Sequence, residues 1–161
     1  MDKQVEIIPA TIDDALEILD LQKLAYQSEA RIYNDWTIPP LRETADDIIA
    51  EFNTHIFLKA IGEHLLVGSV RVCTMGTTCY IGKLIVHPQL QNRGIATRLI
   101  AEAEMMHKDM ARFELFTGSK SAKNIHLYHK CGYQEFRREK LSDNIELMYL
   151  EKIVPSALRL K

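Results

Sequence analysis

Residues 79–117 constrain the fold most, because a strand, a helix and a second strand follow one another there without a long loop. The apolar run 79–86 predicts a strand, the amphipathic pattern from about 94 to 108 predicts a helix, and the run 112–117 predicts another strand. A strand–helix–strand unit places its two strands parallel through a right-handed crossover. We therefore expect a mixed α/β (α+β) fold with a parallel pair at its centre.

The rest of the chain supplies strands and helices on both sides of this unit. Two apolar runs precede residue 79 and are separated by short turns, which is typical of an antiparallel meander. No repeat or Gly/Ser linker interrupts the order, so we expect one domain over residues 1–154 and a short tail over 155–161. The remaining strands are expected near residues 5–8, 56–61, 65–74, 133–141 and 145–154, and the remaining helices near 11–27, 44–52 and 121–131.

The charge of the chain is small in total but unevenly placed. Of 161 residues, 47% are hydrophobic and the net charge is −2, which excludes a disordered chain and argues against nucleic acid as a partner. Two windows, 83–98 and 117–134, hold no Asp or Glu and sum to +6, which leaves −8 elsewhere. They are therefore suited to a ligand with several negative charges. Their basic residues are Lys83, Arg93, Arg98, Lys120, Lys123 and Lys130.

Cysteine and histidine spacing predicts neither a disulfide framework nor a catalytic metal. The three cysteines form no CxxC pair and the six histidines show no HExxH-like spacing. The first ten residues lack the features of a signal peptide, and no stretch reaches the ~18 apolar residues of a membrane span. We expect a cytoplasmic protein without a membrane partner.

The segment Gln91–Ala96 is the strongest local motif, because it lies directly between the strand 79–86 and the amphipathic helix. The first amides of a helix lack internal partners and carry a partial positive charge, so they can bind a phosphate. Gly94 and Ala96 leave room for a pyrophosphate there. The alternative, equally weighted for the motif alone, is that both small residues only allow tight packing of the helix on the strand.

With its surroundings, this segment resembles the Q/R-x-x-G-x-G/A signature of the GNAT superfamily of acyl-CoA N-acyltransferases. The preceding Val86-His87-Pro88 is similar to the end of the family's signature strand. Downstream, Asn124, Tyr128 and Gly132-Tyr133 resemble the second family motif, in which an Asn and a Tyr lie four residues apart on a helix that ends in Gly-aromatic. The resemblance is specific over residues 79–133.

The resemblance implies a mixed sheet of six or seven strands with about four helices, whose central parallel strands splay apart to admit acetyl-CoA. It also implies a homodimer. Carried over position by position, the residues expected to bind the cofactor are Leu84, Ile85, Val86, Gln91, Asn92, Arg93, Gly94, Ile95, Ala96, Thr97, Asn124 and Tyr128.

Tyr128 is the expected catalytic residue, because a phenol can donate a proton to the sulfur that leaves when an amine attacks a thioester. A tyrosine packed in the core with its hydroxyl satisfied is the alternative. Several family members carry a Glu base at the position of Gly82, where this chain has none. The base is therefore unassigned, and the substitutes considered, each more readily structural, are Glu29, Tyr33, Tyr80 and Glu114.

The segment 28–41 matches no motif, although the family usually places the acceptor site beneath it. The candidate acceptor-binding residues are Glu29, Tyr33, Trp36 and Tyr80, with Trp36 equally able to be a buried anchor of the loop. The expected function is an acetyl-CoA-dependent N-acetyltransferase that acts on a primary amine of an unidentified small molecule or peptide. The alternative is a non-catalytic acyl-CoA-binding sensor or interaction module. The missing Glu favours the sensor mildly, and Tyr128 favours the enzyme more.

Overall fold

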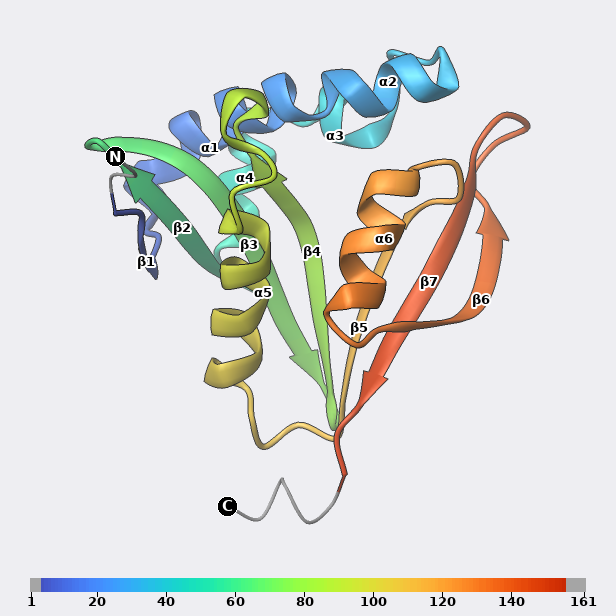
Figure 1. The fold of residues 1–161 in the computed structure, drawn as a ribbon. Coiled ribbons are helices and arrows are strands. Elements are labelled where there is room, and N and C mark those ends of the chain that lie inside the picture. Colours follow the sequence, from blue (N-terminus) through green and yellow to red (C-terminus); the bar gives the residue numbers. More distant parts are fainter. Residues whose placement is uncertain (1–3, 156–161) are drawn as a thin grey trace.

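A computed structural model describes residues 4–155, and its centre is one mixed sheet in the order β1-β2-β3-β4-β5-β7-β6 (Figure 1). The parallel pair is β4 with β5, and the other neighbouring strands are antiparallel. The expected mixed sheet of six or seven strands is thus confirmed, and it has seven. The strands are β1 (Glu6–Pro9), β2 (Ile56–Gly62), β3 (Leu65–Met75), β4 (Thr78–Val86), β5 (Arg112–Gly118), β6 (Gln134–Lys140) and β7 (Glu146–Ile153).

Helices cover both faces of the sheet. Two of them, α5 and α6, contribute to the large core cluster on one face, whereas α1 and α4 form a second cluster on the other. The strand β2 separates the clusters, since Leu58 belongs to the first and the adjacent Phe57 to the second. The helices are α1 (Ala15–Ala25), α2 (Gln27–Tyr33), α3 (Pro39–Arg42), α4 (Ala45–Glu51), α5 (Ile95–Met106) and α6 (Ala122–Lys130).

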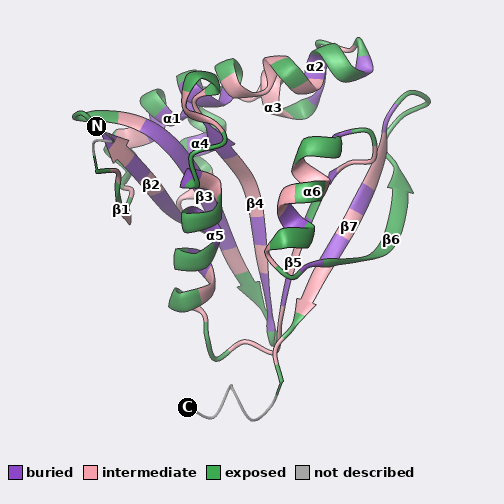
Figure 2. Ribbon diagram, in the orientation of Figure 1, coloured by how far each residue is buried: buried purple, intermediate pink, exposed green. Residues whose placement is uncertain are grey.

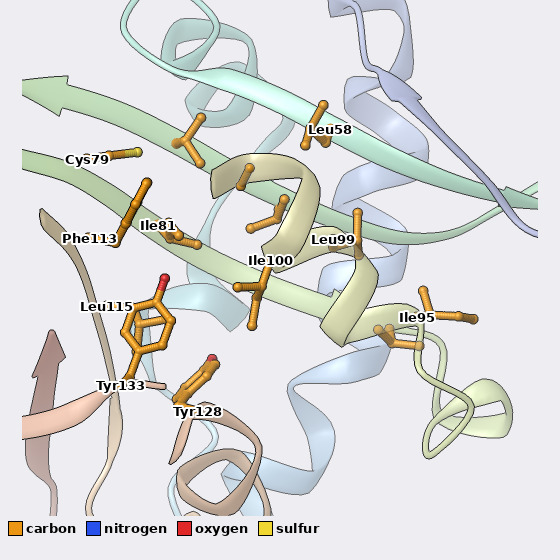
Figure 3. Close-up of a cluster of buried hydrophobic side chains, with 14 of the residues drawn as sticks. Leu58, Cys79, Ile81, Ile95, Leu99, Ile100, Phe113, Leu115, Tyr128 and Tyr133 are labelled. Atoms are coloured by element: carbon orange, nitrogen blue, oxygen red, sulfur yellow. The ribbon is translucent and has the colours of Figure 1, made fainter. Parts of the chain in front are cut away.

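The main core lies where the parallel strands meet α5 and α6 (Figure 3). Leu99 and Ile100 project from α5 onto β3 and β4, while Tyr128 of α6 and Tyr133 beyond it fill the space beside β5. These aliphatic side chains are fully buried, and each contributes about 1.5 to 3 kcal/mol. Burial is concentrated on the central strands, whereas the edge strand β6 is exposed along its whole length (Figure 2).

The two parallel strands separate soon after they begin. Their pairing runs only from Thr78 with Arg112 to Tyr80 with Glu114, and Figure 1 shows β4 and β5 diverging beyond that point. The splay expected from the family resemblance is present. It leaves the β5-facing backbone of residues 81–86 without a partner strand, so those groups are available to a ligand.

A β-bulge interrupts β4 within the opened part. One residue lies between Ser69 and Arg71 on β3, but two lie between their partners Ile85 and Gly82 on β4. The additional residue falls at Lys83, whose φ of 43° is left-handed. The bulge lies in the part of β4 that has no β5 partner.

The segment 28–41 is more helical than its sequence suggests. The expected helix 11–27 ends at Ala25, and α2 follows almost directly because Tyr26 keeps a helical backbone. Asn34 then ends α2 in a left-handed conformation, and Pro39 begins α3 at a position where its missing N–H costs nothing. Of the expected tail, residues 156–161 lie outside the described residues.

Candidate active-site cleft

A cleft of about 810 Å³ opens between the diverging strands. Its walls come from β4 and β5, its ends from α2 and the N-terminal turn of α5, and one side from α6. The lining is mostly apolar with a few polar side chains, as in typical small-molecule sites. The opened sheet therefore provides a binding site of ligand size.

The loop before α5 presents backbone amides to this cleft. Asn92 and Gly94 both have left-handed φ angles, of 65° and 84°. The first helical hydrogen bond runs from the Arg98 amide to the Gly94 carbonyl at 3.0 Å, so the amides of residues 95–97 precede the helical pattern. A Cβ at Gly94 would meet no atom within 4 Å. Gly94 is therefore needed for its left-handed backbone conformation. The alternative, that it only allows the helix to pack tightly on the strand, is excluded for this residue.

The side chain of Gln91 braces the same loop. Its Nε2 donates to the Val86 carbonyl at 3.2 Å, and its Oε1 accepts from Lys123 Nζ at 2.6 Å. These contacts tie the end of β4 to α6 across the top of the cleft. Gln91 thus fixes the loop and at the same time brings a lysine of the second basic window toward the α5 N-terminus.

Lys83, by contrast, adds no net positive charge to the cleft, because two carboxylates neutralise its ammonium. Although it lies in the first basic window, its ammonium forms ion pairs with Glu43 and Glu51. The expectation that the whole window adds positive charge to the ligand site is wrong for this residue. The bulge that turns Lys83 toward these carboxylates is the physical reason.

Arg71 is the centre of a buried polar network that sequence reasoning missed. It is 2% exposed, donates to Glu51 at 2.9 Å and to Gln22, and lies over the Phe57 ring at 4.9 Å. Together with Lys83 it holds α1, α4 and the bulged strand in register. Arg71 lies among six consecutive buried residues of β3, 67–72. The nearly unbroken apolar run 65–74 was the signal for its burial, since such runs are typical of strands covered on both faces.

Tyr128 lies in the wall of the cleft with its hydroxyl available. Its ring packs near that of Tyr133, with centroids 6.4 Å apart (Figure 3). No residue among 4–155 forms a hydrogen bond with the Tyr128 hydroxyl. Burial, followed by the neighbouring Tyr26 and Glu29, raises the pKa of Tyr128 above its ordinary range. The phenol therefore keeps its proton at neutral pH, which suits a proton donor.

Glu29 enters the cleft from α2 and meets α6. Its carboxylate accepts hydrogen bonds from the Ser121 hydroxyl and from Asn124 Nδ2, the latter at 3.1 Å. Asn124 Nδ2 also lies 3.2 Å from Thr117 Oγ1. Burial raises the pKa of Glu29, and the hydrogen bond from Ser121 opposes that rise only in part. The site thus holds a partly desolvated carboxylate beside the predicted Asn124.

The structure brings most of the predicted site residues together. The expected acceptor residues Glu29 and Tyr33 line the cleft, whereas Trp36 and Tyr80 lie outside its lining. Trp36 is 48% exposed, so it is not a buried anchor. Glu114 is held by an ion pair with Arg112. Of the expected cofactor residues, Arg93 lies outside the lining, and those within it are Leu84, Ile85, Val86, Gln91, Asn92, Gly94, Ile95, Ala96, Thr97, Asn124 and Tyr128.

Neither a metal cluster nor a membrane-spanning helix is found among the described residues. Across residues 4–155, no group of three or more His, Cys, Asp or Glu side chains is placed to hold a metal ion. His129 Nδ1 instead lies 3.0 Å from the Tyr133 carbonyl. None of the helices in this range is long and apolar enough to cross a membrane.

Comparison with known proteins agrees with this geometry. The model of the acetyltransferase (GNAT) family matches residues 16–133. The UPF0157 protein YqkA of Bacillus subtilis (strain 168) is 27% identical over 133 residues, which are 83% of this chain and 38% of that protein. The chain therefore spans less than half the length of this curated relative.

Solved structures with low sequence identity share the fold. The PaiA N-acetyltransferase of Thermoplasma acidophilum, solved in complex with coenzyme A, has a TM-score of 0.74 at 16% identity and covers 94% of this chain and 99% of its own. The Smu.2055 protein of Streptococcus mutans UA159 has a TM-score of 0.79 at 16% identity, with coverage of 92% and 98%. At these identities, the likeness concerns the fold alone.

Proposed function

Because the chain belongs to the acetyltransferase (GNAT) family, we propose that it transfers an acetyl group from acetyl-CoA to a primary amine. The observation that carries the proposal is the unpartnered Tyr128 hydroxyl in the wall of a cleft that has free helix amides at one end. The coenzyme A in the PaiA complex supports a ligand of this class for the shared fold.

The residues present fit such a ligand in shape and charge. The amides of residues 95–97 and the ammonium of Lys123 suit a pyrophosphate. The unpaired edge of β4 suits the amides of a pantetheine arm, as peptide groups there lack a partner strand. Acetyl-CoA would supply the activated acetyl thioester. The chain would orient it between β4 and α6, with Tyr128 beside it.

Tyr128 would donate its proton to the departing sulfur. General acid catalysis of this kind contributes roughly 10²- to 10⁴-fold to a rate. The Tyr128→Phe variant should therefore release CoA more slowly by about that factor, while its affinity for CoA in calorimetry stays near that of the wild type.

The matched control is Tyr133→Phe, which removes a hydroxyl that donates to Glu104 at 2.7 Å outside the cleft. This control should lose stability but keep its rate. Unchanged turnover of Tyr128→Phe would remove the residue from the mechanism.

The second candidate function is a non-catalytic acyl-CoA sensor. It is favoured by Gly82, which supplies no carboxylate where the family often has its base. Tight binding of acetyl-CoA without release of CoA, over a broad panel of amines, would favour the sensor over the enzyme.

A further inference from the structure

Glu29 stands out because it is the one carboxylate among the described residues that line the cleft. Its hydrogen-bond donors, the Ser121 hydroxyl and the Asn124 amide, are both neutral. Within residues 4–155 it forms no ion pair, since none of the ion pairs there includes it. A carboxylate held inside an apolar cleft by neutral donors alone is missing the cation that would offset its desolvation.

We propose that Glu29 binds the ammonium group of the acceptor and removes its proton, and that this acceptor is a monoamine with an apolar substituent. The inference rests on the proposed function, because it names the acceptor of that same site. It also assigns the proton-accepting role to α2, whereas the family resemblance directs attention to β4 at Gly82. A Cβ at Gly82 would meet no atom within 4 Å, so that position is open space.

The position of Glu29 suits an amine that approaches Tyr128. Asn124 contacts Glu29 directly and lies four residues before Tyr128, so the two α6 side chains share one helix face. The charge of Glu29 also contributes to the raised pKa of Tyr128. Proton acceptor and proton donor therefore face the same part of the cleft.

The residues that line the cleft favour an acceptor with one positive charge over an acceptor with several. One carboxylate can balance one ammonium, and the other charged side chains of the lining are lysines. A second ammonium on the acceptor would find no described carboxylate in the cleft. The walls near α2 and β7 are apolar instead, and include Ile32, Ile38, Phe116, Ile145 and Leu147. An alkyl or arylalkyl group fits them better than a polyamine does.

The pKa of Glu29 supports the assignment. Burial raises it, which brings the carboxylate closer to the affinity for protons that a base needs near neutral pH. The groups that face it are Ser121, Asn124 and Tyr128 from α6 and Tyr26 from the start of α2. None of these is positively charged, so a bound ammonium would lower the pKa of Glu29 again.

The reaction balances with these two groups. The ammonium gives one proton to the Glu29 carboxylate and becomes a free amine, which forms the new C–N bond at the thioester carbonyl. The C–S bond breaks, the sulfur takes the Tyr128 proton, and the second amine proton restores the phenol. Glu29 then releases its proton to water. The products are the N-acetylated amine, CoA and one proton.

The test measures binding of hexylammonium chloride to the full chain by calorimetry, with 1-hexanol as the uncharged probe and spermidine as the polyamine. The variant is Glu29→Gln, which keeps an oxygen that can accept from Asn124, and the matched control is Glu17→Gln on the exposed face of α1. We expect Glu29→Gln to bind hexylammonium roughly 10- to 100-fold more weakly, the range for a lost hydrogen bond to a charged group. Glu17→Gln should bind it like the wild type, and the wild type should bind hexanol and spermidine more weakly than hexylammonium.

Equal hexylammonium binding by Glu29→Gln and the wild type would overturn the proposal, as would equal binding of hexanol. A second measurement needs no variant: carbon NMR of the Glu29 carboxyl in the wild type should show its pKa fall when hexylammonium binds. A pKa that does not move would also refute the assignment.

Failure of the proposed function has a different signature. If the wild type does not bind CoA, the acetyltransferase proposal is rejected. That result would leave the ammonium site unaffected, because hexylammonium binding is measured in the absence of CoA. Full hexylamine acetylation by Glu29→Gln would reject the role of Glu29 and leave the acetyltransferase intact.

Discussion

Gly118 at the end of β5 is the point on which α2 docks, and adding one methyl group there tests that docking. A Cβ at residue 118 would lie 2.0 Å from Tyr33 Oη and 2.7 Å from its Cζ. Tyr33 cannot move aside freely, since it is 8% exposed and packs against Ala30, Ile38 and Ile145. Its hydroxyl also accepts a hydrogen bond from the Lys120 amide at 2.9 Å.

The cost of Gly118→Ala follows from these contacts. Overpacking a closed core costs about 1 to 3 kcal/mol, and the lost hydrogen bond costs about 1 kcal/mol. The free energy of unfolding should fall by about 2 to 4 kcal/mol. For a chain of this length, that lowers the melting temperature by roughly 5 to 15 °C.

The control for Gly118→Ala is Gly82→Ala on the opposite wall of the cleft. A Cβ at Gly82 would meet no atom within 4 Å, so this variant should stay within about 1 kcal/mol of the wild type. Urea titrations followed by circular dichroism measure both variants. A cost for Gly118→Ala no larger than that for Gly82→Ala would refute the steric reasoning.

A double-mutant cycle isolates the contact itself. In a Tyr33→Leu background the ring that the new Cβ would meet is gone, so Gly118→Ala should cost at least 1 kcal/mol less there. The same cost in both backgrounds would show that Tyr33 is not the obstacle. Because α2 also carries Glu29, Gly118→Ala should reduce amine acetylation more than CoA binding.

Three further outcomes are expected. Gly94→Ala should destabilise by about 1 to 2 kcal/mol and weaken CoA binding in calorimetry, since its φ of 84° strains any residue with a Cβ although space is open. Arg71→Met should cost about 3 to 5 kcal/mol in urea titrations, because it leaves Glu43 and Glu51 with one cation fewer in a largely buried network. The pKa of Asp14 is raised by burial but lowered overall by hydrogen bonds from Lys59 and Thr11, so its stabilisation holds at neutral pH and is lost as pH falls below the ordinary 3.8. An Asp14→Asn variant should show a smaller loss of stability over that acid range.

Local pattern and spacing were enough to predict the framework of the fold. The strand, loop and helix of residues 79–108 are contiguous, so hydrophobic periodicity and the position of Gly94 define them without knowledge of distant contacts. The placement of Tyr128 in the cleft follows from the same kind of information, because a four-residue spacing from Asn124 fixes a helix face. The splay itself came from the family resemblance and not from periodicity.

The parts that sequence did not predict depend on contacts across long separations. Glu29 meets Ser121 and Asn124, which lie more than ninety residues away in the chain, and only the docking of α2 on β5 brings them together. The bulge at Lys83 is one residue of mismatch between two strands, which leaves no mark in the composition of either. No local motif encodes these relations. The sequence therefore offered Glu29 only as one of several candidates for the base and for acceptor binding, with nothing to single it out.

Contacts between residues distant in the sequence change the distribution of charge in the cleft from the one that the sequence suggests. Counted along the chain, Lys83 belongs to a basic window and Glu29 to the acidic remainder. In space Lys83 is neutralised by two carboxylates, while Glu29 enters the cleft and Lys123 is drawn to the loop before α5. The cleft is therefore positive where a polyanion would bind and negative where α2 meets α6. A site with both signs can hold a phosphate-bearing donor and a cationic acceptor together, because each is attracted to a different end.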